Sequence, residues 1–141
     1  MTSQTFSYHN FNASEADGLK IRSLLQVLHL DQEDLNLQEF KVCKLGHELI
    51  AIGRIRQHDD CLELCSLGVD ELHRGKGVGK LLIKALLSEQ HQDVYVVTEI
   101  PGYFQEQGFK ITDKVWTSLL LKQKRCVDQL ACQKPVIMIR Q

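Results

Sequence analysis

Prolines are scarce in this sequence, and no segment of it resembles a linker. The chain has two prolines in 141 residues, Pro101 and Pro135, and each stands alone near the end of an apolar segment. We find no internal repeat, no low-complexity tract and no stretch rich in proline, glycine and serine. Because 43% of the residues are hydrophobic, a chain of this length can enclose one core, and we expect a single domain over residues 1–141.

The chain also lacks a large excess of charge of either sign. Its formal net charge is -1, which argues against the broad basic surface that holds nucleic acid. Its apolar runs are far shorter than a membrane span, and residues 1–18 are polar without the apolar core of a signal peptide. We therefore expect a cytoplasmic protein that binds neither nucleic acid nor a membrane.

The five cysteines include no CxxC pair, and their number is odd. Both features favour reduced thiols over a disulfide framework. His58 with Cys61 and Cys65 could suggest a metal site, but the two cysteines fall in a predicted strand, where cysteine is commonly a buried hydrophobic residue. We expect no metal.

Apolar periodicity predicts a helix followed by strands. Ser14 and Asp17 have the spacing of a capping box, and apolar residues then recur at helical spacing, which predicts a helix near residues 15–29. Short apolar runs separated by polar turns follow. They predict an antiparallel meander of three strands: Phe40–Cys43, Leu49–Ile55 and Cys61–Val69.

The next segments predict a crossover. After Gly79 the apolar residues form one helical stripe to about Gln90, and Val94–Thr98 is a β-branched strand. Strand, helix and strand in this order join parallel strands, so we expect an α/β fold with a mixed sheet. Three further segments follow: a helical turn at Tyr103–Gln107, an amphipathic stretch at 114–128 to which the pattern assigns no secondary structure, and a strand at Val136–Ile139.

The strand-to-helix junction carries three glycines, Gly75, Gly77 and Gly79, together with basic residues. Unpaired N–H groups and the helix dipole favour an anion at a helix N-terminus, and glycines let phosphate oxygens approach the amides. Neither the dinucleotide fingerprint nor the Walker loop has this spacing. A tight turn with solvated cations is the alternative interpretation.

This junction resembles motif A of the GCN5-related N-acetyltransferase (GNAT) superfamily, Arg/Gln-x-x-Gly-x-Gly/Ala, which here is Arg74-x-x-Gly77-x-Gly79. The segment Tyr103–Phe109 is similar to the family's aromatic-x-x-x-Gly-Phe element. Within the superfamily, the chain looks most like the bacterial amino-acid acetyltransferase branch related to N-acetylglutamate synthase. The resemblance implies a mostly antiparallel sheet flanked by helices, with the parallel crossover at the cofactor site.

The resemblance also implies the cofactor and the reaction. Acetyl-CoA would bind with its pyrophosphate on the loop and its pantetheine arm along the end of the preceding strand, and the acetyl group would pass directly to the amine of a small molecule such as an amino acid. Two alternatives remain open: a non-catalytic module that binds acetyl-CoA, and a protein N-acetyltransferase. The cofactor-binding residues implied are Leu67, Gly68, Val69, Arg74, Gly75, Lys76, Gly77, Val78, Gly79, Lys80 and Phe104.

Glu63 is the candidate general base. It lies six residues before Val69, hence on the same face of a regular strand, and its position resembles the base glutamate of histone acetyltransferases in the superfamily. A solvated surface charge is the alternative, and Glu99 is the reserve base. Phe104 stands where many relatives have the tyrosine that protonates the thiolate, so the acid is in doubt. An apolar cluster could line an acceptor pocket, form a homodimer seam or belong to the core: Trp116, Leu119, Leu120 and Leu121.

Overall fold

A computed structural model describes residues 7–114, 116–129 and 132–141. Its centre is a seven-stranded sheet in the order β1-β2-β3-β4-β5-β7-β6. Neighbouring strands are antiparallel except for β4 and β5, which are parallel. The strands are β1 (Tyr8–Asn12), β2 (Phe40–Leu45), β3 (Glu48–Gln57), β4 (Leu62–Val69), β5 (Val94–Thr98), β6 (Lys110–Ile111) and β7 (Val136–Arg140).

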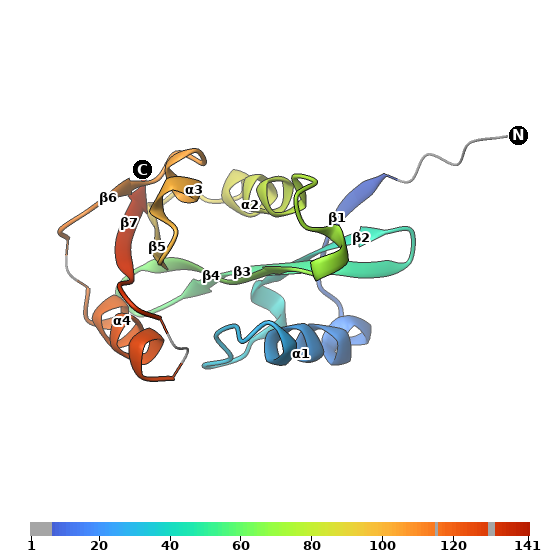
Figure 1. Cartoon of the computed structure of the whole chain (residues 1–141), viewed down its shortest axis with the longest axis horizontal. Helices are drawn as coiled ribbons and strands as arrows, with labels where there is room; N and C mark the ends of the chain where they lie inside the picture. The colour runs from blue at the N-terminus through green and yellow to red at the C-terminus, as the bar shows by residue number, and fades with distance from the viewer. Residues whose placement is uncertain (1–6, 115, 130–131) are drawn as a thin grey trace, which may run out of the picture.

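Helices cover both faces of this sheet (Figure 1). They are α1 (Gly18–Val27), α2 (Val78–Ser88), α3 (Pro101–Gln105) and α4 (Thr117–Gln129). In Figure 1, α2 and α3 lie above the sheet, and α1 and α4 lie below it. The apolar stripe of α2 packs on β3 and β4 in the largest core cluster, while α1 and α4 each seal a smaller cluster on the opposite face. None of the helices among the described residues is long and apolar enough to cross a membrane.

A β-bulge at Ser66 changes the side-chain alternation of β4. Arg54 of β3 pairs with Cys65 of β4, and Ile52 of β3 pairs with Gly68 of β4. Two steps along β3 therefore correspond to three steps along β4. Ser66 has φ 53°, in the left-handed region. Because the extra residue reverses the alternation, Leu64 and Val69 both pack on the α2 side. The expectation that Glu63 shares a face with Val69 is therefore wrong: Glu63 points toward α4, where it contacts Lys122.

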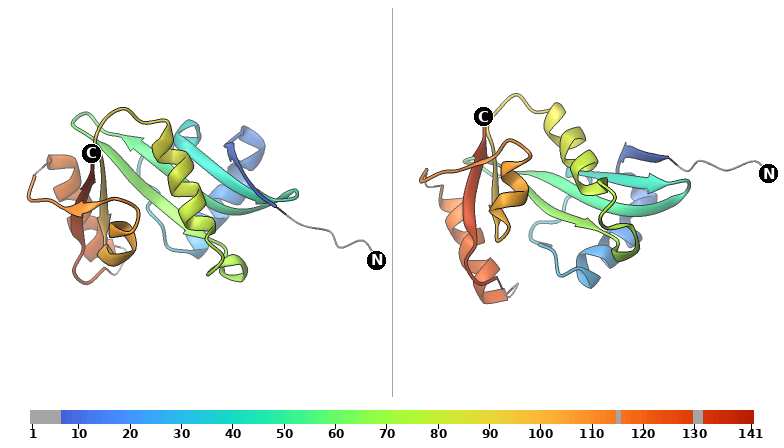
Figure 2. Two further views of the ribbon diagram at one scale, coloured as in Figure 1. Left: turned by 90° about the horizontal axis from the view of Figure 1, so that it is seen from above. Right: turned by 45° about the horizontal axis from the view of Figure 1, so that its top comes forward.

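The parallel pair β4–β5 is short. It runs only from Leu62↔Val94 to Leu64↔Val96, and beyond these residues the two strands separate (Figure 2). Backbone groups on the facing edges of β4 and β5 consequently have no strand partner there among the described residues. This divergence opens a wedge in the middle of the sheet.

Most of the predicted elements are confirmed. The first helix begins in a short 3₁₀ turn at Glu15–Asp17, and the backbone N–H of Ser14 donates to the Asp17 carboxylate over 2.9 Å, as in a capping box. The meander, the crossover and the last strand lie where the apolar pattern predicts them. The amphipathic stretch at 114–128, which had no assigned secondary structure, contains most of α4. Residue 115 of this stretch lies outside the described residues. The edge strands β1 and β6 were not predicted from the sequence.

The prediction of reduced cysteines is wrong at one pair. Cys126 and Cys132 form a disulfide with a Cα–Cα distance of 5.2 Å, while Cys43, Cys61 and Cys65 are free. The chain turns back after α4, and the N–H of Cys132 donates to the carbonyl of Cys126 over 2.9 Å. The two cysteines are brought together by this turn and not by a recognisable motif, so their spacing gave no signal.

Candidate active site

The glycine-rich junction forms a cavity of about 270 Å³, here called the loop cavity. Gly75 and Gly77 have φ values of 77° and 78°, which residues with a Cβ rarely adopt. Gly77 is the N-cap of α2, and no side chain of the described residues caps this helix end. The cavity is lined by Val69, His73, Arg74, Gly75, Gly77, Val78, Gly79, Lys80, Tyr103, Glu106 and Gln107.

The loop cavity has the features of an anion site. The first N–H groups of α2 have no intrahelical acceptor, and the positive end of the helix dipole lies there. Arg74 and Lys80 add two cations, and Arg74 is held across the loop by a 3.2 Å bond from its Nε to the carbonyl of Val69. Lys76, which the resemblance assigns to the cofactor, is exposed and does not line the cavity.

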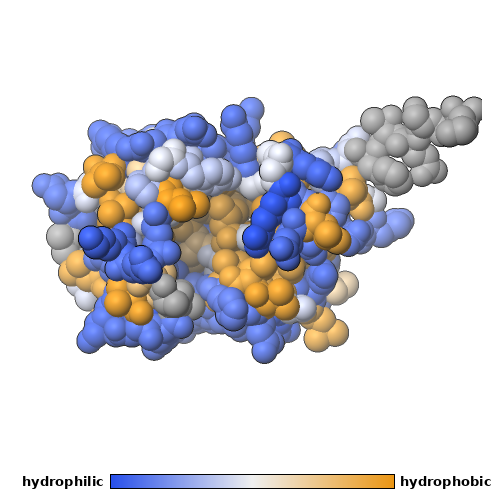
Figure 3. All heavy atoms as spheres, in the orientation of Figure 1, coloured by the Kyte–Doolittle hydropathy of each residue, from blue (hydrophilic) through white to orange (hydrophobic). Residues whose placement is uncertain are grey.

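The wedge between β4 and β5 holds a second cavity of about 330 Å³, here called the wedge cavity. The face seen in Figure 3 is hollowed in its middle, with hydrophobic residues in the depth of the hollow. The α1–β2 loop and α4 form its walls on one side, and α3 closes the other. It is lined by His29, Leu30, Asp31, Leu64, Cys65, Ser66, Leu67, Val96, Val97, Thr98, Glu99, Ile100, Tyr103, Phe104, Lys122, Cys126 and Cys132.

Tyr103 connects the two cavities, because it lines both. Its hydroxyl lies over the start of α2: a Cβ on Gly79 would be only 2.9 Å from the Tyr103 Oη. Burial, followed by the nearby Glu106, raises the pKa of Tyr103, so its phenol keeps its proton. Phe104 lines the wedge cavity, but it is also a core residue, with 6% exposure and edge-to-face packing on Phe109.

Glu63 has no exposed surface and lines neither cavity. Its Oε1 lies 2.7 Å from the Nε2 of His58, and its Oε2 lies 3.3 Å from the Nζ of Lys122. The Lys122 contact lacks hydrogen-bond geometry, so the buried Oε2 has no hydrogen-bond partner among the described residues. The candidate base therefore sits one layer behind the cavity wall.

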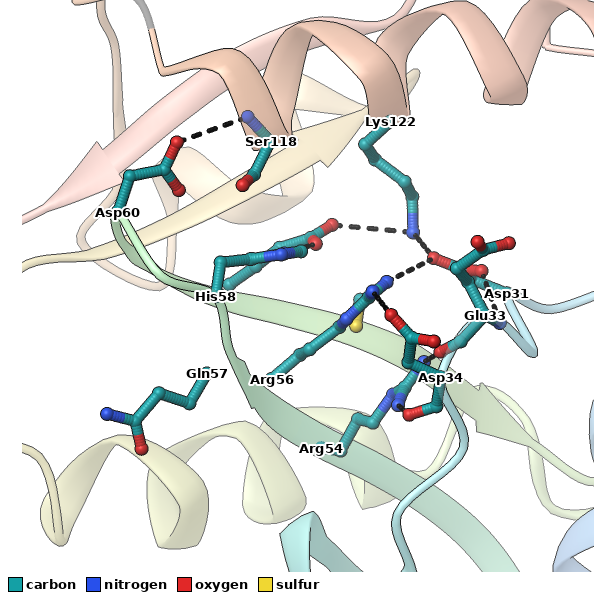
Figure 4. Close-up of polar contacts among 12 residues, drawn as sticks. Asp31, Glu33, Asp34, Arg54, Arg56, Gln57, His58, Asp60, Ser118 and Lys122 are labelled. Atoms are coloured by element: carbon teal, nitrogen blue, oxygen red, sulfur yellow. Dashed lines mark hydrogen bonds and ion pairs between the residues drawn. The ribbon is translucent and has the colours of Figure 1, made fainter.

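The charged groups that do face the wedge cavity from this side are Lys122 of α4 and Asp31 of the α1–β2 loop. They form a buried ion pair, in which Lys122 points from α4 toward Asp31 (Figure 4). Burial alone would lower the pKa of Lys122, but the carboxylate of Glu63 and then Asp31 raise it overall. Burial would likewise raise the pKa of Asp31, but Lys122 and then Arg125 lower it overall.

A third cavity of about 480 Å³ lies on the far side of this ion pair and is here called the outer cavity. Its walls are the end of β3, the α1–β2 loop and α4. His58 and Arg56 reach it from β3 and the turn that follows. In Figure 4, Arg56 extends from the lower left toward Asp31 and Asp34, and His58 lies to the left of the Lys122–Asp31 pair. Buried charges thus separate the wedge cavity from the outer cavity.

The structure brings together part of the site predicted from sequence. Val69 and most of the motif residues line the loop cavity, and Leu67 and Phe104 line the wedge cavity. Gly68 lines neither, since Leu28 and Leu30 fill the space beside it. The reserve base, Glu99, lines the wedge cavity and accepts a hydrogen bond from the backbone N–H of Gln133.

Asp31 and Lys122, which line the wedge cavity, were not predicted from the sequence. Lys122 did leave a signal, because it lies three residues after Leu119 and four before Cys126, all on the buried face of α4. A lysine on an apolar helix face requires a buried partner. Asp31 lies in a loop, where no periodicity identifies it. Within the described residues, no group of three or more His, Cys, Asp or Glu side chains could hold a metal ion.

Comparison with known proteins agrees with this geometry. Residues 8–102 match the acetyltransferase (GNAT) family, which covers more than half of the chain. An uncharacterised N-acetyltransferase of Chlorobaculum tepidum is 26% identical over 84% of this chain and 77% of its own length. The chain belongs to the acetyltransferase (GNAT) family. It is accordingly an acyltransferase.

Solved structures show the same fold at low sequence identity. N-acetylglutamate synthase of Neisseria gonorrhoeae, complexed with coenzyme A and L-arginine, superposes with a TM-score of 0.77 at 16% identity over 98% of this chain. Because this chain spans only 34% of the synthase, the likeness concerns one part of that enzyme. Rv2747 of Mycobacterium tuberculosis, solved in complex with CoA, gives 0.72 at 21% identity over 94% of this chain and 98% of its own.

Proposed function

We propose that this protein transfers an acetyl group from acetyl-CoA directly to the amine of a small molecule, such as an amino acid. The observation that carries the proposal is the meeting of two cavities at Tyr103. One cavity is built to hold an anion at the N-terminus of α2, and the other leads into the wedge between parallel strands. A cofactor with a pyrophosphate, an extended arm and a reactive end matches this arrangement.

The cofactor would bind mainly through backbone groups. Its pyrophosphate would accept hydrogen bonds from the first amides of α2, with Arg74 and Lys80 supplying charge. Its pantetheine arm would pair with the free edge of β4 near Leu67–Val69, in the manner of an added strand. The thioester would then lie in the wedge cavity, where the bound geometry favours attack by an amine.

Glu63 is the proposed base. An ammonium must lose a proton before it can attack, since a lysine-like amine has a pKa of about 10.4 and an α-amine about 8. Glu63 can serve through a neighbouring group, because its Oε2 is a buried carboxylate oxygen without a hydrogen-bond donor among the described residues. Glu99 stays the reserve, as it lines the wedge cavity directly. Water or Tyr103 would return a proton to the thiolate.

A second candidate is a regulatory module that binds acetyl-CoA without turning it over. Two observations favour it: Glu63 has no exposed surface, and Phe104 carries no hydroxyl. The acceptor could also be a protein amine, and the lining of the wedge cavity leaves this open. An experiment must therefore measure binding and turnover separately.

A screen of amines tests the proposal. Release of CoA from acetyl-CoA is measured by chromatography with L-glutamate and other amino acids, then with spermidine, an aminoglycoside and a peptide with a free N-terminus. We expect at least one amine, and an amino acid first, to accelerate release well above the amine-free rate. If calorimetry shows binding of acetyl-CoA but no amine accelerates release, the regulatory module is the better account.

A further inference from the structure

The chain Lys122–Glu63–His58 joins the wedge cavity to the outer cavity. Lys122 lines the wedge cavity, its Nζ lies 3.3 Å from Glu63 Oε2, and Glu63 Oε1 lies 2.7 Å from His58 Nε2. His58 in turn lines the outer cavity. The side chains of Lys122, Glu63 and His58 are 6%, 0% and 8% exposed, so bulk water does not reach the middle of this chain.

A buried base needs a route by which its proton can leave. Among the described residues, His58 is hydrogen-bonded to the Glu63 carboxylate, and the Nζ of Lys122 lies 3.3 Å from the other carboxylate oxygen without hydrogen-bond geometry. Lys122 is held as an ammonium by the carboxylates of Glu63 and Asp31, so it cannot keep an additional proton. An imidazole can accept a proton on one nitrogen and release one from the other.

We infer that His58 is the proton exit of the reaction and carries protons from Glu63 to the water of the outer cavity. This inference rests on the proposed function. The outer cavity is then a proton outlet and not the acceptor site. His58 acts through Glu63 and does not touch the substrate. Its role is distinct from holding Glu63 in place, which an amide side chain could also do.

The protons balance along this route. The substrate ammonium loses two protons in becoming the amide. The amine nitrogen bonds to the acetyl carbon as the C–S bond breaks, and CoA leaves as a thiolate that takes up one of these protons through water. The other proton passes to Lys122 as its ammonium turns to give one to Glu63 Oε2 across the 3.3 Å between them, so Lys122 is an ammonium before and after. The proton gained by the Glu63–His58 pair is matched by one that His58 releases to water.

Charged groups of both signs surround His58. The charged groups come from every element around the outer cavity and from the two contacts of the Glu63 carboxylate. They are Glu33 and Asp34 of the α1–β2 loop, Glu39 before β2, Arg56 of β3, Asp59 beside His58, Glu63 of β4, and Lys122 and Arg125 of α4. Acidic and basic side chains are mixed here, so substitution of His58 should not produce a large change in the net electrostatic field.

Substitution and rescue of His58 test the inference. His58→Gln keeps an N–H donor for Glu63 but cannot carry a proton, and we expect kcat to fall by about 10- to 100-fold with KM for acetyl-CoA unchanged. In His58→Ala, added imidazole should restore kcat in proportion to its concentration, because the vacated space opens into the outer cavity. The acceptor is the fastest amine of the set above, and circular dichroism verifies the fold.

Matched variants separate this inference from the proposed function. His47→Gln, at an exposed histidine in the β2–β3 turn, should keep wild-type kcat and show no response to imidazole. Normal kcat in His58→Gln, together with a slow Glu63→Gln, overturns the proton exit and leaves Glu63 as the base. A slow, folded His58→Ala that imidazole does not restore assigns His58 a structural role. Normal kcat in Glu63→Gln, or no active amine at all, removes the proposed chemistry and this inference with it.

Discussion

At the scale of single residues, Glu63 carries the proposed chemistry. Glu63→Gln preserves the size of the side chain and its place between His58 and Lys122, but it removes the proton acceptor. We expect kcat to fall by about 10²–10⁴-fold, with the affinity for acetyl-CoA nearly unchanged. Steady-state kinetics beside calorimetry make this comparison. Turnover close to wild type would transfer the role to Glu99 or to solvent.

The free cysteines make a second residue-scale prediction. Burial, followed by nearby acidic groups, raises the pKa of Cys61 to about 12, and burial followed by Glu63 does the same for Cys65. The thiolate is the reactive form, and at pH 8 almost none of it is present at such values. Iodoacetamide at pH 8 should therefore leave both residues unlabelled in the folded protein and label both after unfolding, as read by mass spectrometry. Rapid labelling of the native protein contradicts these environments.

At the scale of elements, the Asp31–Lys122 pair attaches α4 to the α1–β2 loop across the wedge cavity. Removing one partner of a buried pair leaves an uncompensated charge, so Asp31→Asn and Lys122→Met should each lower the free energy of unfolding by about 3–5 kcal/mol. The double variant should lose less than the sum, with a coupling of about 1 kcal/mol or more, measured by urea unfolding. Additive losses would mean that the pair contributes nothing as a pair.

The same pair gives α4 a pH-dependent attachment. The pKa of Asp31 is lowered in the folded state, so its stabilisation is complete above the ordinary value of about 3.9 and is lost as the pH falls through the folded-state value. The pKa of Lys122 is raised, so its contribution is present below about 10.4 and is lost as the pH rises through the folded-state value. Between these limits the pair is intact.

The disulfide at the end of α4 is the second element-scale feature. Cys126 and Cys132 close a short loop, which stabilises the folded state by about 2 kcal/mol in the chain-entropy account. Thiol titration of the unfolded protein should count three free thiols without reductant and five after reduction. Five thiols before reduction would contradict the disulfide and agree with the expectation that all five cysteines are reduced.

At the scale of the whole molecule, the sequence predicts the helices and strands better than it predicts the buried charges that separate the wedge cavity from the outer cavity. Apolar periodicity locates the meander and the crossover, because a face that packs on a core repeats at fixed spacing. The bulge at Ser66 has no such signature, yet it turns Glu63 to the face opposite Val69. The Lys122–Asp31 contact joins residues 91 positions apart, which no local pattern can reveal.

We propose that acetyl-CoA occupies the loop cavity and the wedge cavity together, with its pyrophosphate on the amides at the start of α2. Calorimetry with acetyl-CoA tests this most directly in two glycine variants that share the same backbone strain. Gly77 and Gly46 have φ values of 78° and 62°, and a Cβ at either position would have no described atom within 4 Å. Both substitutions to Gln should therefore lower the stability by a similar amount, about 1–2 kcal/mol.

Only one of these variants lies at the proposed site. Gly77→Gln places a side chain where the phosphates would approach the amides, so it should abolish the binding of acetyl-CoA while the domain stays folded. Gly46→Gln, in the turn between β2 and β3, should bind as the wild type does. Equal affinity for acetyl-CoA in the two variants would contradict the account.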